Sequence, residues 1–374
     1  MKRNRGFRIV LSMIGLGALM AYVVACRPSW SPDGSKLLLA CWSQQRNQSV
    51  ITLFDKATGK TSVVFEAPAG CMAWCQWDRK GQNAIVAFVK DLGGPQKLEV
   101  HLIPVDSQKP GRKYEIEAVE CTPGIPLPEV NGNLLVGGNP LVRLNLETGE
   151  VQRRPVEDRE EVILVGEGDR IYYCSKIGEE DYEVGTVDPE KLSLEPLAGL
   201  PGKEVGEVFP LIAVAKDGSA IAVNSRKEGQ SFLLLIRGKE LQKPVALQFP
   251  QETHELGNLQ WSPDQKTVYA ALGAKQADEK RARLGVGEIS VASGVVRVIP
   301  VLEAVGQGNG MDVDAWILDF QIALSPDGKT IAAACTYLKE SPDQGDRALY
   351  LVDLTSPDRK VKRIPLSAPP IAAP

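Results

Sequence analysis

The sequence contains two histidines, His101 and His254, and either is a candidate general base for hydrolysis. They stand far apart in the chain, and His101 lies in the strand-like run EVHLIPV, which indicates a structural or surface residue. The chain has no Gly-x-Ser-x-Gly elbow, His-Glu-x-x-His helix, Cys-x-x-Cys pair or glycine-rich phosphate loop. We therefore assign no catalytic residue and do not expect an enzyme.

Two acids, Asp312 and Asp314, lie between Gly308 and Trp316 and suggest a calcium loop. Such loops place several oxygen ligands at fixed spacing, and these two acids lack the rest of that pattern. No metal site and no cofactor are predicted.

The segment Lys275 to Arg283 (KQADEKRAR) mixes four basic and two acidic residues with alanines. It is a candidate contact for anionic headgroups or an acidic partner. A solvated charged loop with a short helical turn is the simpler interpretation.

The first residues have the layout of a secretory signal: Lys2, Arg3, Arg5 and Arg8, then an uncharged apolar run from Ile9 to Ala25. Residues 1–25 are therefore predicted to be a signal peptide. A signal anchor is an alternative, although a membrane span needs ~17 to 25 apolar residues and this run is at the short limit.

The end of this run, Val23-Val24-Ala25-Cys26, resembles the lipobox of bacterial lipoproteins. The resemblance implies that Cys26 is lipidated and becomes the mature N-terminus. It also implies a membrane-anchored lipoprotein of the bacterial cell envelope, facing the periplasm or the exterior. A cysteine that merely lies beside an ordinary cleavage site is the alternative.

Charge excludes one class of partner. Removing residues 1–25 takes away four basic side chains and lowers the formal net charge from −4 to −8. Proteins that bind nucleic acid need basic surface to neutralise phosphates, so we expect no nucleic acid as partner.

A lipidated Cys26 leaves six of the seven cysteines. Cys71 and Cys75 are four residues apart in a predicted strand, which separates them by ~13 Å and prevents a disulfide. Cys41 and Cys335 occupy matching positions in different repeats. A bridge between them is conceivable, but buried thiols are the simpler prediction.

A turn signature recurs along the chain and predicts the fold. It reads Trp30-Ser-Pro-Asp-Gly34, Trp77-Asp-Arg-Lys-Gly81, Trp261-Ser-Pro-Asp264 and Leu324-Ser-Pro-Asp-Gly328. Proline presets φ, aspartate bonds the backbone and glycine accepts a positive φ, so each copy should join two antiparallel strands. Short apolar runs such as KLLLACW follow these turns, as expected of buried strands.

Two independent landmarks count seven repeats. Weaker turns at Asn131-Gly132, Glu167 to Asp169 and Lys216 to Gly218 complete a set of seven first hairpins, and seven outer hairpins such as Asn145 to Gly149 accompany them. Roughly 50 residues per unit suits a four-stranded blade. We predict an all-β, seven-bladed β-propeller of four-stranded antiparallel blades over residues 26–366, with residues 367–374 as a disordered tail.

The Trp-Ser-Pro-Asp-Gly turn followed by an apolar strand resembles the WD40-like (PD40) repeats of TolB-like propellers. Blades one, six and seven match well, whereas residues 78 to 250 match only in spacing. TolB proteins have six blades and a further α/β domain, so the resemblance implies fold and class and transfers no functional residue. Trp30, Trp77 and Trp261 share one place before the turn and are expected to fill the space between blades.

Strand alternation places the first and third turns of every blade on one face. The longer segments fall on the other: Gly273 to Glu288, Leu302 to Ile317, Lys339 to Arg347 and Ala118 to Glu129. Because loops on a rigid scaffold usually carry recognition, we expect binding on this elaborated face.

We therefore predict a protein-interaction or scaffold module with an envelope protein as partner. A small-molecule-binding or lactonase-like enzyme that uses the central channel is the alternative. The ligand-binding residues are unknown at this point.

Overall fold

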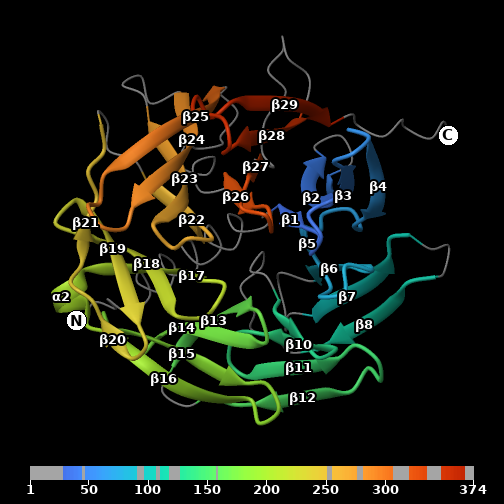
Figure 1. The fold of residues 1–374 in the computed structure, drawn as a ribbon. Helices are drawn as coiled ribbons and strands as arrows, with labels where there is room; N and C mark the ends of the chain where they lie inside the picture. The colour runs from blue at the N-terminus through green and yellow to red at the C-terminus, as the bar shows by residue number, and fades with distance from the viewer. Residues whose placement is uncertain are drawn as a thin grey trace, which may run out of the picture.

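The computed structural model describes residues 28–43, 47–90, 97–106, 110–117, 127–156, 159–250, 255–275, 281–305, 320–334 and 347–366. Most of them form strands in seven small antiparallel sheets, and these sheets are arranged in a ring (Figure 1). The chain passes around the ring once, so that the first and last sheets are neighbours. The protein is a seven-bladed β-propeller, as the repeats predicted.

Each blade is built from consecutive strands, with the first strand innermost. Blade 1 contains β1 Ser29–Trp30, β2 Lys36–Ser43, β3 Gln48–Asp55 and β4 Thr61–Glu66, and blade 2 contains β5 Ala73–Trp77, β6 Asn83–Lys90, β7 Lys97–Pro104 and β8 Arg112–Ile116. Blade 3 contains β9 Glu129–Val130, β10 Asn133–Val136, β11 Leu141–Asn145 and β12 Val151–Arg154, and blade 4 contains β13 Glu160–Glu167, β14 Arg170–Lys176, β15 Tyr182–Asp188 and β16 Ser193–Leu200.

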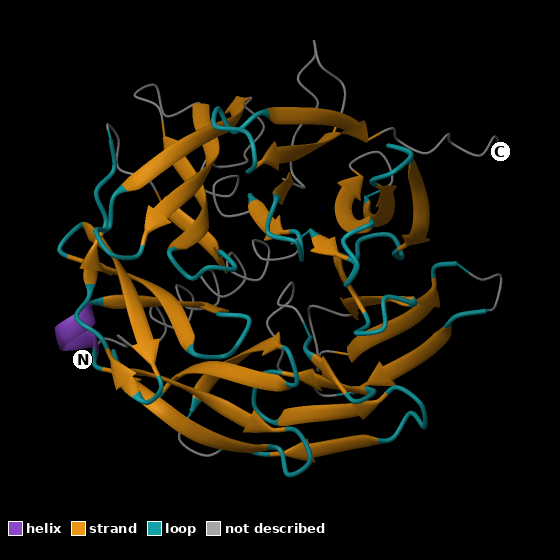
Figure 2. Cartoon of the chain, in the orientation of Figure 1, coloured by secondary structure: helices purple, strands orange, loops and turns teal. Residues whose placement is uncertain are grey.

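The remaining strands form blades 5 to 7. Blade 5 contains β17 Glu207–Val214, β18 Ala220–Lys227, β19 Gln230–Arg237, β20 Glu240–Leu241 and β21 Val245–Ala246. Blade 6 contains β22 Glu255–Trp261, β23 Thr267–Lys275, β24 Arg281–Ser290 and β25 Val296–Val305. Blade 7 contains β26 Gln321–Leu324, β27 Thr330–Ala334, β28 Arg347–Asp353 and β29 Val361–Leu366. One short helix, α2 Gly202–Val205, precedes blade 5. Figure 2 shows it at the outer edge of an otherwise β ring.

Strand direction gives the ring two different faces. The first and third turns of every blade lie on one face, which we call the turn face. The second turns and the links between blades lie on the other, which we call the connection face. Every first turn predicted from the sequence joins the first and second strands of a blade. Gly34, Gly81 and Gly328 adopt the expected positive φ of 65 to 70°, and Gln265 takes the same place in blade 6 with φ 57°.

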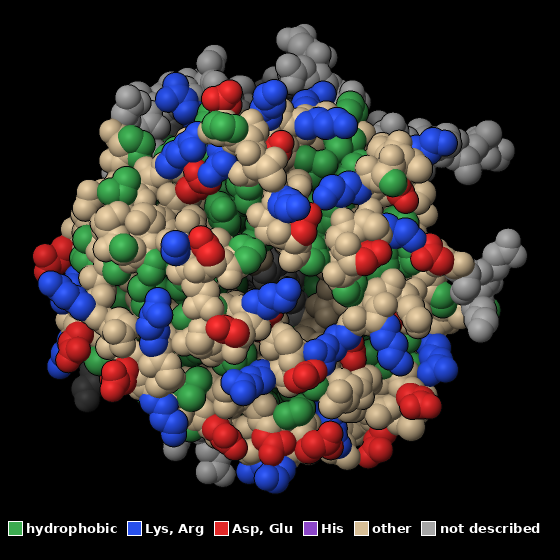
Figure 3. Space-filling model, viewed as in Figure 1, with side chains coloured by type: hydrophobic (Ala, Val, Ile, Leu, Met, Phe, Trp, Pro, Cys, Tyr) green, Lys and Arg blue, Asp and Glu red, His purple; other side chains and the backbone are tan. Residues whose placement is uncertain are grey.

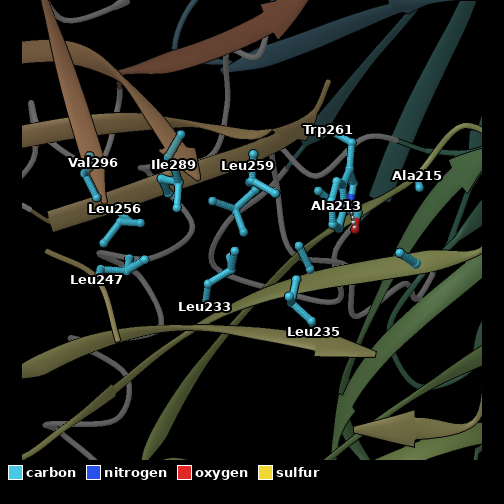
Figure 4. Close-up of a cluster of buried hydrophobic side chains, with 14 of the residues drawn as sticks. Ala213, Ala215, Leu233, Leu235, Leu247, Leu256, Leu259, Trp261, Ile289 and Val296 are labelled. Carbon is cyan, nitrogen blue, oxygen red and sulfur yellow. Dashed lines mark hydrogen bonds between the residues drawn. The ribbon is translucent and has the colours of Figure 1, made fainter. Parts of the chain in front are cut away.

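The hydrophobic core lies between the blades. Each of the seven clusters of buried apolar side chains joins two neighbouring blades, and one of them joins blade 7 to blade 1. Figure 4 shows the cluster between blades 5 and 6, where Leu233 and Leu235 face Leu256 and Leu259. Because an apolar face of every blade is covered by its neighbour, the ring behaves as one packed body.

The three turn tryptophans lie in this interblade core, as predicted. Each indole also donates a hydrogen bond to the preceding blade, which the sequence did not reveal. Trp261 Nε1 donates to the backbone oxygen of Ala213 at 3.0 Å (Figure 4). Trp77 Nε1 donates to Ser29 O at 3.0 Å, and Trp30 Nε1 to Ala323 O at 3.1 Å.

Among the described residues, blade 1 and blade 7 are each built from their own strands, and no strand of one blade completes the sheet of the other. Blade 1 keeps its own innermost strand, β1, although this strand has only two residues. Blade 7 is complete with β26 to β29. Closure therefore depends on the Trp30 bond, the shared core and the packing of the Pro326 ring against Gly34 in the neighbouring turn.

Three sequence predictions need correction. The segment Gly273 to Glu288 is mostly strand, because β23 continues to Lys275 and β24 starts at Arg281, so Lys275 to Arg283 forms no helical turn at its ends. Cys71 lies just before β5 rather than in a strand, with its N–H bonded to Pro68 O. The outer edge of blade 5 consists of two short strands, β20 and β21, instead of one fourth strand. Just after β21, Gln248 forms an isolated β-bridge with Val295 of blade 6.

Candidate functional site

The acids of the turn face are part of the turns themselves. Ser31 Oγ donates to Asp33 Oδ1 at 2.5 Å and accepts from Lys36 N at 2.9 Å. The bonds from Ser31 and then from Ser35 lower the pKa of Asp33 to about 2. The same Ser–Asp bond recurs from Ser262 to Asp264 and from Ser325 to Asp327, and lowers the pKa of both acids. These carboxylates stabilise hairpins and are therefore poor candidates for proton transfer.

The innermost strands surround a central opening. Figure 3 shows one face of the ring, hollowed at its centre, with basic and acidic side chains interspersed around the hollow. On the turn face, Arg79 of blade 2 forms an ion pair of 2.5 Å with Asp169 of blade 4. Glu129 of blade 3 accepts the backbone N–H groups of Arg79 at 2.8 Å and Gly132 at 2.7 Å. These contacts join three successive blades at the rim of the opening.

A cluster of five titratable side chains lies on blade 2. Glu99 in β7 is almost fully buried, with 5% of its side chain exposed. His101 Nε2 lies 2.6 Å from Glu99 Oε1, and Lys113 Nζ lies 3.0 Å from Oε2. Lys90 Nζ also pairs with Oε2, and Glu115 lies 3.2 Å from Lys113. Register explains the grouping, because Glu99 and Glu115 are cross-strand partners and His101 pairs with Lys113.

The surroundings of Glu99 favour its charged form. Burial raises the pKa of this carboxyl, but hydrogen bonds from Lys90, His101 and Lys113 outweigh burial and lower the pKa to about 2. The carboxylate is therefore ionised throughout the physiological range. Phe65 of blade 1 and Phe88 of blade 2 lie 4.7 Å and 5.7 Å from the His101 ring, centroid to centroid. His101 is thus a packed residue that links two blades, as its strand-like sequence indicated.

On the described part of the connection face, the strands of blade 6 extend into a ribbon, and the short helix α2 lies in the link to blade 5. β23, β24 and β25 are 9, 10 and 10 residues long, and their pairing continues to Lys275–Ala282 and Arg281–Val305. We call residues 273–275, 281–284 and 302–305 the blade 6 ribbon. By sequence it contains three basic residues, Lys275, Arg281 and Arg283, and one acid, Glu303, which is the cross-strand partner of Arg283.

Several predicted residues lie outside the described residues. They are Cys26, His254, Asp312, Asp314 and Cys335, with most of the predicted connection-face segments. Among the residues that the structure describes, no group of acids, cysteines and histidines could hold a metal ion. No helix in those ranges is long and apolar enough to cross a membrane.

Four cysteines are within the described ranges, and none of them forms a disulfide there. Cys41, Cys75 and Cys174 are buried in the interblade core. Burial raises the pKa of Cys174 to about 12 and that of Cys75 still further. These thiols are small core side chains with no nucleophilic character at neutral pH.

Sequence reasoning missed the Glu99 cluster and the Arg79 contacts. The alternation Glu99-Val-His101 placed two polar side chains on one strand face, and this was the available signal. The lysines that complete the cluster come from two other strands. Their approach depends on hairpin register, which the sequence alone left open.

No protein-family model matches the chain, and no curated protein matches it. Solved structures do. The Myceliophteria thermophila Cps50 (Swd1) β-propeller domain aligns with a TM-score of 0.53 and 10% identity over 84% of this chain and 94% of that one. The β-propeller domain of the Trilobed protease from Pyrococcus furiosus aligns with a TM-score of 0.50 and 16% identity over 71% and 78%.

A prolyl endopeptidase structure aligns with a TM-score of 0.51 and 16% identity over 84% of this chain. This chain spans 47% of that peptidase's length. At such identities these similarities show the propeller fold alone, because the same fold supports scaffolds and peptidase domains. The resemblance to TolB-like repeats and to lipoproteins stays a prediction.

Proposed function

We propose that this chain is a membrane-anchored β-propeller of the bacterial cell envelope that acts as a protein-interaction module. The observation that supports it best is the blade 6 ribbon, an extended three-stranded element on the connection face. Strand-built protrusions on a rigid body present side chains in fixed positions, which suits recognition of another protein.

The chemistry of the described surface supports binding over catalysis. The turn carboxylates are bonded within their own hairpins, and Glu99 is neutralised by two lysines. The ribbon carries Arg283 at an exposed position on β24, opposite Glu303 on β25. Since the ribbon contains three basic residues and one acid, an envelope protein with an acidic surface is the partner that it fits by charge.

In-cell photo-crosslinking tests this proposal. A benzophenone amino acid replaces Arg283 on the ribbon in one variant and Ala292, in the turn at the opposite end of the same blade, in the control. We expect reproducible envelope-protein adducts at position 283, identified by mass spectrometry, and few at position 292. Equal adduct patterns at both positions, or none at 283 while the protein remains in the envelope, contradict an interaction role for the ribbon.

The anchor is tested separately. Growth with labelled palmitate should label the full-length protein and leave the Cys26→Ala variant unlabelled. Labelling of both, or of neither, contradicts lipidation at Cys26.

A further inference from the structure

A second charged surface lies on the connection face, beside the blade 6 ribbon. It consists of the second turn of blade 4, the α2 link and the second turn of blade 5, and we call residues 177–181, 203–207 and 228 the blade 4–5 surface. Six acids are exposed on it against one exposed base, Lys203. These acids are Glu179, Glu180, Asp181, Glu204, Glu207 and Glu228. The blade 4–5 surface is therefore negative, whereas the ribbon is positive by sequence.

Hydrogen bonds hold the backbone of the blade 4–5 surface in place. Ile177 N donates to Asp181 O at 2.9 Å and closes the blade 4 turn. Asp181 Oδ1 accepts Gly202 N at 2.9 Å and fastens this turn to α2. Lys227 Nζ donates to two backbone oxygens of the α2 segment at 2.8 and 3.1 Å. A surface that is ordered in advance loses less conformational entropy on binding, which favours recognition by fixed charges.

The two surfaces have complementary charge and are neighbours on one face of the ring. Blades 4, 5 and 6 follow one another around it (Figure 1). A two-fold axis that lies in the plane of contact and passes through blade 5 places the blade 4–5 surface of one copy on the ribbon of a second copy. The same axis places the ribbon of the first copy on the blade 4–5 surface of the second. Both contacts form together, as in any isologous interface.

We infer that this protein self-associates through its connection face as a two-fold dimer, with the ribbon of each copy against the blade 4–5 surface of the other. The inference rests on the proposed function, because it assigns the acidic partner of the ribbon to a second copy of this chain. Opposite charges on the two surfaces favour this register and disfavour ribbon against ribbon.

Charge exchange in the full-length protein tests the pairing. Two differently tagged copies are co-expressed, one tag is captured from a detergent extract, and the other tag is quantified. We expect Glu179→Lys/Glu180→Lys and Arg283→Glu each to reduce self-capture at least about fivefold, because like charges then meet in both contacts. When one copy carries the first change and the other copy carries the second, capture should return to most of the parent level, because each reversed surface meets a complementary one.

A matched control separates this pairing from a general effect of charge. Glu147→Lys/Glu150→Lys reverses two exposed acids in the third turn of blade 3, on the turn face, and should leave self-capture unchanged. Thermal midpoints by circular dichroism establish that the variants are folded. Absence of self-capture in the parent overturns the inference. So does an exchanged pair that stays as low as the single forms, or an equal loss in the control.

Salt dependence and adduct mass complete the test. Raising NaCl from about 50 mM to about 500 mM should reduce self-capture of the parent at least about threefold, because salt screens exposed charges. Self-capture that salt does not change overturns pairing by charge. In the photo-crosslinking at position 283, adducts of two copies of this chain support the inference. Adducts with other proteins alone overturn self-association and leave the ribbon as an interaction site, whereas no adduct removes both.

Discussion

The indole Nε1 of Trp30 donates a 3.1 Å hydrogen bond to the backbone oxygen of Ala323 and thereby joins blade 1 to blade 7. The acceptor is in each case the residue directly before the tryptophan position of its own blade. These acceptors are Ala323 before Leu324, Ser29 before Trp30, and Ala213 before Val214. The repeated tryptophan is therefore both a core side chain and a connector between blades.

Replacing Trp30 by phenylalanine keeps most of the apolar volume and removes the donor. Ala323 O then loses its partner in a buried setting, and we expect the free energy of unfolding to fall by about 1 to 3 kcal/mol. Urea unfolding followed by tryptophan-independent circular dichroism measures this loss. Lys56→Ala is the control, because it removes the cation whose ammonium group lies 5.4 Å from the Trp30 ring and leaves the indole hydrogen bond in place, so it should cost less than about 1 kcal/mol. A Trp30→Phe protein as stable as the parent would refute the connector role.

Interlocked turns give a second prediction. Gly81 has φ 65°, and a Cβ there would lie 2.9 Å from Cδ of Pro32 in the neighbouring blade. Gly59 has φ 68° with no atom within 4 Å of such a Cβ. Both alanine variants incur the left-handed backbone cost of about 1 to 2 kcal/mol, and only Gly81→Ala adds a clash with a rigid ring. We expect a clearly lower thermal midpoint for Gly81→Ala than for Gly59→Ala, and equal midpoints would contradict the interlock.

The fold was predictable because its information is local and repeated. Pro, Asp and Gly at fixed offsets specify each first turn, and the apolar run that follows specifies a buried strand. The period then fixed the number of blades. Even the degenerate turns at Asn131-Gly132 and Glu167 to Asp169 were found, because their spacing agreed with the stronger copies.

The polar contacts of the folded ring were not predictable, because they join residues that come from different strands. Trp30 and Ala323 are 293 positions apart, and the Glu99 cluster needs side chains from three strands in one register. The extension of β23 and β24 was missed for another reason. The run Lys275 to Arg283 is charged and alanine-rich, which favours a loop or helix locally, whereas pairing with β25 makes its ends strand.

A third prediction concerns Asn258, whose buried amide bonds both backbone groups of Ile322 in the next blade. Nδ2 donates to Ile322 O at 2.7 Å, and Oδ1 accepts from Ile322 N at 2.9 Å. Asn258→Leu leaves a buried N–H and a buried oxygen without these partners, so we expect a loss of about 2 to 4 kcal/mol in urea unfolding. Gln260→Leu, which removes only a bond to the adjacent Leu259 O, should cost less than about 1 kcal/mol. Comparable losses in the two variants would show that the two bonds of Asn258 to Ile322 add no more to the free energy of unfolding than the single bond of Gln260 does.

The last prediction uses the pH dependence of Glu99. Its pKa is lowered from 4.5 to about 2 in the folded protein, so the ionised form stabilises the fold fully above about pH 5 and progressively less as pH falls toward 2. Glu99→Gln removes the charge and leaves Lys90 and Lys113 facing a neutral amide. We expect the variant to be about 2 to 3 kcal/mol less stable at pH 7.

The difference between the parent and Glu99→Gln should shrink by more than half at pH 3, because the parent is then losing the same interaction. Other carboxylates titrate in both proteins and cancel in the difference. Glu115→Gln is the matched control: its carboxylate is about half exposed, and its removal should cost less than about 1 kcal/mol at either pH. A difference that is constant between pH 7 and pH 3 would mean that packing of the side chain, and not its charge, is what Glu99 contributes to the stability of the fold.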